Sequence, residues 1–116
     1  MFEGHDTTAA AVVWSLFMLG CHLDAQQKCY EEIKYFCGDC DYIDLETLGK
    51  LTFLECFIKE VLRLYPSVPF IARRLSCDAE IGGYVLPTNT QVIINIYQIH
   101  RDPEHWEDAE KFMPDR

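Results

Sequence analysis

Three groups of polar residues could carry chemistry in this chain. The first is Gly4-His5-Asp6-Thr7-Thr8, where an acid and a hydroxyl are neighbours just before a strongly apolar run. Such a pair can relay a proton into a water-poor pocket, and Gly4 leaves room for a ligand to approach the backbone. The simpler interpretation is a helix N-terminus capped by Asp6 or Thr7. The alternative is a helix that continues through the cluster and is distorted there, because local conflicts of this kind occur at functional sites.

Glu60 and Arg63 form the second group. Residues three apart face the same side of a helix, so these side chains can form an ion pair. A surface pair, which contributes under ~1 kcal/mol, is the simpler interpretation. However, the pair is interleaved with apolar residues such as Val61 and Leu62, and a charged pair close to a core needs further partners. Arg116 is one candidate partner.

Basic residues beyond Pro66 form the third group. Arg73 and Arg74 lie in a strand-like run, so alternation places them on opposite faces. One could point inward, toward an anion such as a carboxylate or a phosphate, or both could be exposed at a sheet edge. His100 and Arg101 could be another anion contact or simply polar loop residues.

Cysteine spacing offers one further possibility. Of six cysteines, Cys37 and Cys40 have the C-x-x-C spacing. A structural zinc site needs a second pair of Cys or His at a suitable distance, and none follows Cys40 with that spacing. We expect a turn with two exposed or half-buried thiols, and we keep a small zinc-binding or interaction module as the alternative.

The composition is that of an ordinary globular chain. Of 116 residues, 49% are apolar, 10 are Lys or Arg and 19 are Asp or Glu, so the net charge is −9. This acidic balance argues against nucleic acid as a partner, because phosphate binding requires clustered Lys and Arg. The longest apolar run, 9–21, is shorter than the ~20 residues that a membrane-spanning helix needs. We expect a helix there that is apolar nearly all round and buried inside something larger.

Periodicity and turn residues predict helices followed by a small sheet, a mainly α fold of the α+β class. Capping boxes at Asp24 and Thr52 are expected to open the second and third helices, and Pro66 to end the third. Gly82-Gly83 is expected to form a two-residue hairpin turn. The expected helices are about 9–19, 25–36 and from Thr52 to about 64, and the expected strands are 70–75, 80–81, 84–86 and 91–99.

Taken in order, these features resemble the cytochrome P-450 family of haem-thiolate monooxygenases, and the resemblance covers the whole chain. The runs 2–8 and 68–74 are similar to the eukaryotic family-four branch, especially its insect members. The matching motifs are Gly4-His5-Asp6-Thr7-Thr8, the E-x-x-R motif within 59–66, His100-Arg101-Asp102-Pro103 and Phe112-Met113-Pro114-Asp115-Arg116.

The resemblance implies roles for individual residues. The first helix would cross the distal face of haem b, with Glu3, Gly4 and Thr7 against the cofactor. Asp6 and Thr7 would be catalytic and deliver protons for cleavage of the O–O bond of dioxygen. In some members, a Glu at the position of Glu3 forms an ester to a haem methyl group. Arg73 would bind haem through a propionate, and His100 would also bind haem. Glu60, Arg63 and Arg116 would form a structural ion triad. The substrate pocket would be formed by Val68, Pro69, Phe70 and Ile71.

The same resemblance implies an internal segment of a longer protein. The family's haem ligand is a Cys in a Gly-rich loop beyond the motif that ends at Arg116, and none of the six cysteines lies in such a context. We therefore expect no metal ligand among these residues and no activity from this chain alone, which could also be a truncated, non-catalytic binding protein. The implied parts are a central distal helix (1–20), a helix and loop (21–50), the E-x-x-R helix (51–65), a small β-sheet (66–99) and a loop (100–116).

For the full-length protein, the resemblance implies insertion of one oxygen atom from O2 into a lipophilic substrate, a fatty acid or a xenobiotic. Electrons would come from NADPH-cytochrome P-450 reductase, with cytochrome b5 as a second donor. The expected location is the cytosolic face of the endoplasmic reticulum membrane, with the membrane anchor outside these residues.

Overall fold

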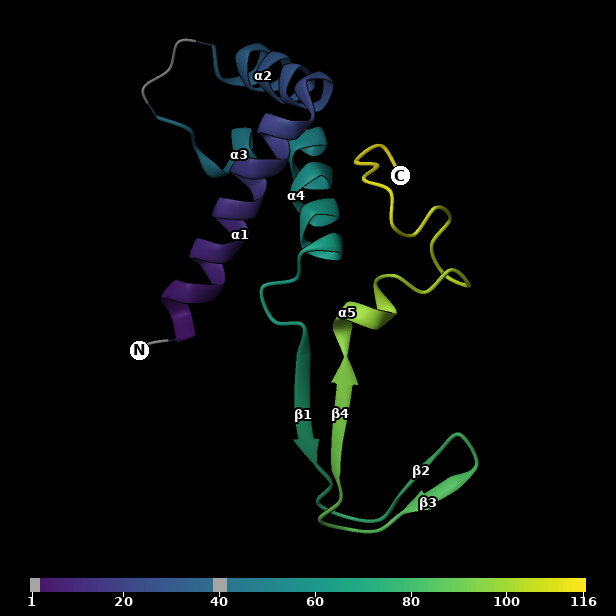
Figure 1. Cartoon of the computed structure of the whole chain (residues 1–116). Coiled ribbons are helices and arrows are strands. Elements are labelled where there is room, and N and C mark those ends of the chain that lie inside the picture. The colour runs from purple at the N-terminus through teal and green to yellow at the C-terminus, as the bar shows by residue number, and fades with distance from the viewer. Residues whose placement is uncertain (1–2, 39–41) are drawn as a thin grey trace.

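The chain separates into a helical region and a narrow β-ribbon that points away from it (Figure 1). The computed structural model describes residues 3–38 and 42–116. The elements are α1 (Glu3–Cys21), α2 (Leu23–Cys37), α3 (Leu45–Leu48), α4 (Thr52–Leu64), β1 (Phe70–Arg74), β2 (Ala79–Ile81), β3 (Tyr84–Leu86), β4 (Gln91–Asn95) and α5 (Ile96–Ile99). The predicted mainly α fold with a small β-sheet is confirmed.

Helix α1 runs through the polar cluster near its N-terminus. It covers Glu3–Cys21, so Asp6 and Thr7 lie inside the helix and their interpretation as a cap is wrong. The Thr8 hydroxyl donates to the carbonyl oxygen of Gly4 at 3.3 Å, a bond to the preceding turn that satisfies a hydroxyl within a helix. The helix therefore continues through the cluster, as the alternative interpretation predicted, and it remains α-helical past Gly4.

Much of α1 is exposed, although an apolar helix was expected to be buried. Val13, Leu16 and Phe17 are 63%, 64% and 55% exposed, whereas Met18 is 4% exposed and faces the other helices. A helix that is apolar nearly all round is typical of a position covered on every side. The described residues cover α1 on one side only.

Helix α2 begins one residue before the expected cap. Its N-cap position is His22 and its first residue is Leu23, so Asp24 lies in the first turn and its prediction as a cap is wrong. A carboxylate in the first turn still interacts favourably with the positive end of the helix dipole. The helix ends at Cys37, one residue beyond the prediction.

Helix α4 is capped from another helix. Its N-cap position is Leu51, so the predicted capping box at Thr52 is wrong. Instead, the carboxylate of Glu32 in α2 accepts hydrogen bonds from the backbone N–H of Phe53 at 2.8 Å and of Leu54 at 2.9 Å. The start of α4 is thereby tied directly to α2.

The core lies where α1, α2 and α4 meet. Trp14 of α1 stacks on Tyr65, just after α4, with ring centroids 4.2 Å apart and planes inclined by 11°. Tyr65 leaves the helix before Pro66, as predicted. The buried residues of the central cluster are Met18, Ala25, Cys29, Phe57 and Val61.

A short helix that the sequence analysis missed precedes α4. Helix α3 occupies Leu45–Leu48, directly after a stretch that was predicted as a loop. Asp44 starts it, because its carboxylate accepts from the backbone N–H of Thr47 at 2.7 Å. The single turn is marked in the sequence only by this acidic cap.

The strands form two separate antiparallel pairs, β1 with β4 and β2 with β3. Gly82 and Gly83 have φ of 60° and 80°, as the predicted hairpin turn requires. The predicted strand 91–99 ends at Asn95, so the strand prediction for its last four residues is wrong. The Asn95 side chain accepts from the backbone N–H of Gln98 at 3.1 Å and starts α5 instead.

The molecule is elongated, with extents of 58 × 36 × 23 Å and a radius of gyration of 18.5 Å. A compact chain of this length has a radius of gyration of about 13 Å. Within the described ranges, no single helix has both the length and the hydropathy of a membrane span, although the bent pair Gly4–Cys21 and Leu23–Cys37 meets both criteria jointly.

Candidate functional site

Glu60 and Arg63 are the two buried charged residues of the described chain, with 5% and 3% exposure. Arg63 Nε donates to Glu60 Oε2 at 2.7 Å, and Arg63 Nη2 donates to Glu60 Oε1 at 2.8 Å. This two-point contact matches the fork of the guanidinium to the carboxylate. The interpretation as a surface ion pair is therefore wrong.

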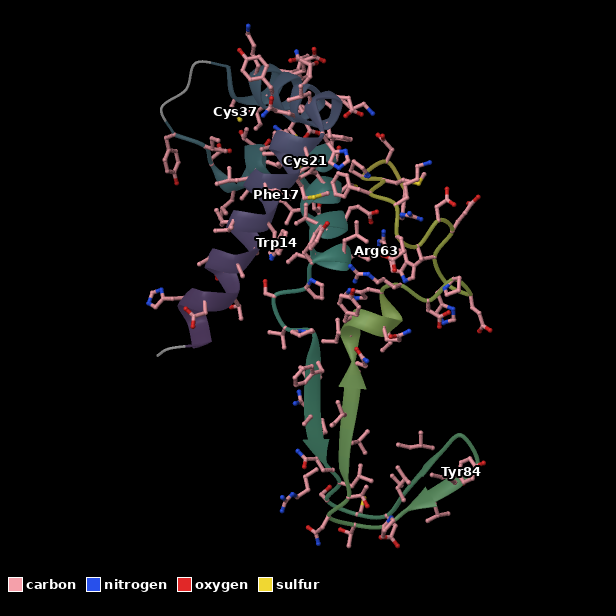
Figure 2. The ribbon with its side chains drawn as sticks, viewed as in Figure 1. Trp14, Phe17, Cys21, Cys37, Arg63 and Tyr84 are labelled. Atoms are coloured by element: carbon pink, nitrogen blue, oxygen red, sulfur yellow. The ribbon has the colours of Figure 1, made fainter. Side chains whose placement is uncertain are left out.

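The segment after α5 supplies further partners for Arg63. In Figure 2, Arg63 lies between α4 and this C-terminal segment. Arg63 Nη1 donates to the carbonyl oxygens of His100 at 2.7 Å and Ala109 at 2.6 Å, and Nη2 donates to that of Lys111 at 3.1 Å. The guanidinium carbon also lies 5.0 Å from the ring centroid of Trp106. A buried arginine is tolerated when its donors are satisfied in this way.

Arg116 joins the same network. Its Nε lies 3.3 Å from Glu60 Oε1, and the backbone N–H of Met113 donates to that oxygen at 2.9 Å. Arg116 Nη2 also donates to the carbonyl oxygens of Asp108 and Lys111, each at 3.3 Å. The structure therefore brings Glu60 and both arginines together, and it binds the C-terminal segment to α4.

Opposing effects act on the pKa of Glu60. Burial raises this pKa, whereas hydrogen bonds from Arg63 and from the Met113 backbone, together with the charges of Arg63 and Arg116, lower it. The net pKa lies below the ordinary value of 4.5. Glu60 is thus a carboxylate at neutral pH, and it balances part of the positive charge of two arginines.

The candidate proton-relay residues lie near the N-terminus of α1. Asp6 is exposed and Thr7 is half-buried, while the side chain of Glu3 lies outside the described part of the structure. A Cβ atom added to Gly4 would meet nothing within 4 Å, so the space beside it is open. The Ser67 hydroxyl donates to the carbonyl oxygen of Thr7 at 2.9 Å, which ties this part of α1 to the segment after α4.

That segment carries the candidate substrate-pocket residues. Val68, Pro69 and Phe70 are exposed, and Ile71 is half-buried. Because Ser67 contacts Thr7, this apolar run begins beside the relay candidates. The fold therefore brings these two groups together, although about 60 residues separate them in the sequence.

The two candidate haem-binding residues outside α1 lie in different surroundings. Arg73 is exposed on β1, and its Nη1 donates to the carbonyl oxygen of Ala72 at 3.0 Å. Arg74 is exposed as well, so neither arginine points into a core. His100 lies in the ion network, with its ring 6.4 Å from that of Trp106. Its Nδ1 is buried without a partner among the described residues.

Two charged residues make contacts at the ends of α4 that the sequence did not reveal. Glu32 belongs to a run of charged residues in α2, yet it caps α4. Arg101 was considered as an anion contact or a polar loop residue. Its Nε does lie 3.2 Å from a carboxylate oxygen of Glu110, and its Nη2 also donates to the carbonyl oxygen of Leu64, the last residue of α4. The acidic run in α2 and the arginine after His100 were visible in the sequence, but their partners were not.

The proposed zinc module receives no support. Cys37 is buried at the end of α2, and Cys40 lies outside the described residues. Among the residues that the structure describes, no group of three or more His, Cys, Asp or Glu side chains could hold a metal ion. Cys37 thus lies buried in a helix, so the expectation of an exposed or half-buried thiol in a turn is wrong for Cys37.

Known proteins share both the sequence and the fold. The profile described as Cytochrome P-450 matches residues 1–116. The chain is 48% identical over 116 residues to the probable cytochrome P-450 4ac2 of Drosophila melanogaster, and the matched region makes up 100% of this chain and 23% of that protein. It is 50% identical over 117 residues to cytochrome P-450 4V2 of Pongo abelii, covering 100% of this chain and 22% of that protein.

A solved structure agrees in fold. A zebrafish cytochrome P-450, determined with progesterone, superposes with a TM-score of 0.93 at 30% identity, covering 98% of this chain and 27% of that one. The chain thus spans less than a quarter of the length of the two curated relatives. The whole-length sequence match, together with the shared fold and the buried Glu60–Arg63 contact, shows that this chain belongs to the cytochrome P-450 family.

Proposed function

We propose that the full-length protein containing this chain is a monooxygenase that inserts one oxygen atom from O2 into a lipophilic substrate, a fatty acid or a xenobiotic. The match of all 116 residues to the family carries this proposal. Support comes from the curated relatives of the family-four branch in fly and orangutan. Activity, substrate and partners belong to the whole protein, of which the chain is a part.

Haem is the cofactor that the family implies for the full-length protein, and the described residues fit it. Arg73 presents an exposed guanidinium, which suits a propionate carboxylate. The open space at Gly4 suits a small ligand beside α1, and the unpartnered Nδ1 of His100 is a further polar group for the cofactor region. Haem supplies the iron at which dioxygen is activated.

Residues of this chain would then bind, orient and protonate. Thr7 would hold a proton at its hydroxyl, and Asp6, one residue away on α1, would pass protons to that hydroxyl. Val68 and Ile71 would contact the substrate and exclude water from it. Glu3 would lie beside the cofactor.

Glu60, Arg63 and Arg116 would act as a structural triad. Their shared contacts bind α4 to the C-terminal segment, and the family's cysteine ligand would follow that segment in the full-length protein. We further propose that electrons come from NADPH-cytochrome P-450 reductase, with cytochrome b5 as a second donor. The proposed location is the endoplasmic reticulum membrane, on its cytosolic face.

The test of this function is oxygen incorporation and its coupling to NADPH in the full-length protein. Wild-type enzyme should place one atom from 18O2 into a fatty acid or a lipophilic xenobiotic. Thr7→Ala should lower the rate of product formation by at least about tenfold, because general acid catalysis contributes that much or more. It should also lower product per NADPH and release peroxide. Thr8→Ala, whose hydroxyl bonds to the Gly4 carbonyl, is the matched control.

Two outcomes would count against the proposal. Absence of 18O from the products of every substrate tested would remove the monooxygenase function. Equal coupling in Thr7→Ala and Thr8→Ala would leave the function in place but remove Thr7 from the proton relay.

A further inference from the structure

We propose that Glu32 and Arg101 are positioning residues that hold α4 at its two ends and thereby keep Glu60 and Arg63 in place for haem retention. This inference rests on the proposed function, since it requires that the full-length protein binds haem. It assigns a task to two charged residues that lie outside the ion triad.

The N-terminal contact is made by both oxygens of one carboxylate. The first N–H groups of a helix have no partner within it, and the N-cap residue of α4 is the apolar Leu51. Glu32 Oε1 accepts from the backbone N–H of Phe53, and Oε2 accepts from that of Leu54. Two bonds from one rigid group restrict both translation and rotation of α4 against α2. The negative charge also lies at the positive end of the helix dipole.

The C-terminal contact is made by an arginine from a distant segment. Arg101 Nη2 donates to the carbonyl oxygen of Leu64, the last residue of α4. Its guanidinium carbon lies 3.8 Å from the Tyr97 ring centroid, and its Nε lies 3.2 Å from Glu110 Oε2. The Arg101 side chain is 11% exposed, so the arrangement is ordered by packing as well as charge. A cation at this end also complements the helix dipole.

Glu60 and Arg63 lie between these two contacts. Arg63 Nη1 donates to the carbonyl oxygen of His100, the residue before Arg101. The same segment therefore bonds to the end of α4 and to the triad. The hydrogen bonds from Arg63 to Ala109 and Glu60 are 2.6 and 2.8 Å long. They tolerate little displacement of the guanidinium, because hydrogen bonds weaken steeply once their geometry departs from the optimum. A small shift of α4 would disturb the whole network.

The test is the rate of haem loss from the full-length holoprotein to an apoprotein acceptor. Glu32→Gln keeps the size of the side chain but replaces one acceptor oxygen with a donor. Its control is Glu31→Gln, next to it on α2, where the carboxylate bonds to Gln27. Arg101→Lys keeps the charge but loses the planar fork, and exposed Arg74→Lys on β1 is its control.

A variant that lowers stability without touching α4's ends separates positioning from general destabilisation. Cys29→Ala removes a buried sulfur from α2 and serves as this reference. Its rate of haem loss is compared with that of Glu32→Gln and Arg101→Lys under conditions where the melting temperature has fallen by the same amount. We expect Glu32→Gln and Arg101→Lys to lose haem about tenfold faster than wild type, in line with the loss of a helix cap. The two surface controls and the Cys29→Ala reference should stay within about twofold.

Haem loss that follows melting temperature alone, or equal rates in Glu32→Gln and Glu31→Gln, would overturn the inference. If Glu32→Gln fails to fold, Glu32→Asp and Arg101→Lys provide the same comparison. A wild-type protein that takes up no haem would instead overturn the proposed function, so the two failures are distinguishable.

Discussion

Glu60 is the residue on which the described ion network converges. It is 5% exposed, yet its carboxylate accepts hydrogen bonds from Arg63, Arg116 and the backbone N–H of Met113. Removing one member of a buried charge group leaves the others uncompensated, which costs more than the group contributes as a whole. Substitution at Glu60 should therefore affect both arginines.

Glu60→Gln in the full-length protein should lower the free energy of unfolding by about 3 kcal/mol at pH 7. The native pKa of Glu60 lies below its ordinary 4.5, so its contribution is present above that value and disappears as the pH falls through the native pKa. Denaturant unfolding from pH 7 to pH 3 should show the difference from wild type shrinking below pH 4.5. Exposed Glu55→Gln on the same helix is the control, and a pH-independent difference would contradict the prediction.

At the scale of elements, contacts between helices decide where α4 lies. Its cap comes from α2, and its far end is joined to α1 by the stack of Tyr65 on Trp14. Offset aromatic pairs contribute roughly 0.5–1.5 kcal/mol beyond the area that they bury. The stack should thus stabilise the packing of α1 against α4 measurably.

A double-mutant cycle on Trp14→Leu and Tyr65→Leu should give a coupling energy of about 1 kcal/mol in the full-length protein. The control cycle combines Trp14→Leu with Tyr84→Leu, because Tyr84 lies on the distant hairpin (Figure 2). The changes in the free energy of unfolding from these two substitutions should simply add. The measurement is denaturant unfolding of the four variants in each cycle. Equal coupling in the two cycles would show that the stack contributes nothing specific.

At the scale of the whole molecule, the chain lacks the compactness of an independent domain. Its radius of gyration is 18.5 Å, and large apolar side chains of α1 are exposed, with Leu16 at 64%. The chain spans 22–23% of its curated relatives. We therefore expect the remainder of the full-length protein to cover α1.

Hydrogen exchange should separate the isolated chain from the full-length protein. Amides of α1 should exchange slowly in the full-length protein and much faster in the 116-residue chain, because local opening depends on apolar contacts.

The isolated chain, reconstituted with haem, reduced and treated with carbon monoxide, should also lack the strongly red-shifted Soret band of thiolate ligation. Slow α1 exchange in the isolated chain, or that band, would contradict this prediction.

The sequence by itself determined several local features of this protein, although not the caps of α2 and α4 or the short helices α3 and α5. An apolar run marked α1, Asp24 and the charged residues after it marked α2, and helical spacing of apolar residues marked α4. Pro66 marked the end of α4, and Gly82-Gly83 marked the hairpin turn. Each signal depends on residues a few positions apart, which is the range over which backbone geometry and side-chain spacing act. The order of the motifs was also sufficient to indicate the family.

Only the tertiary structure decided which polar residues are buried and what satisfies them. Glu32 caps a helix that begins 20 residues later, and Arg63 bonds to carbonyl oxygens up to 48 residues away. Spacing alone favoured a surface pair for Glu60 and Arg63, and the family resemblance added Arg116 as the third member of a structural triad. Their burial depends on where the C-terminal segment folds back, and such long-range packing has no signature in local spacing.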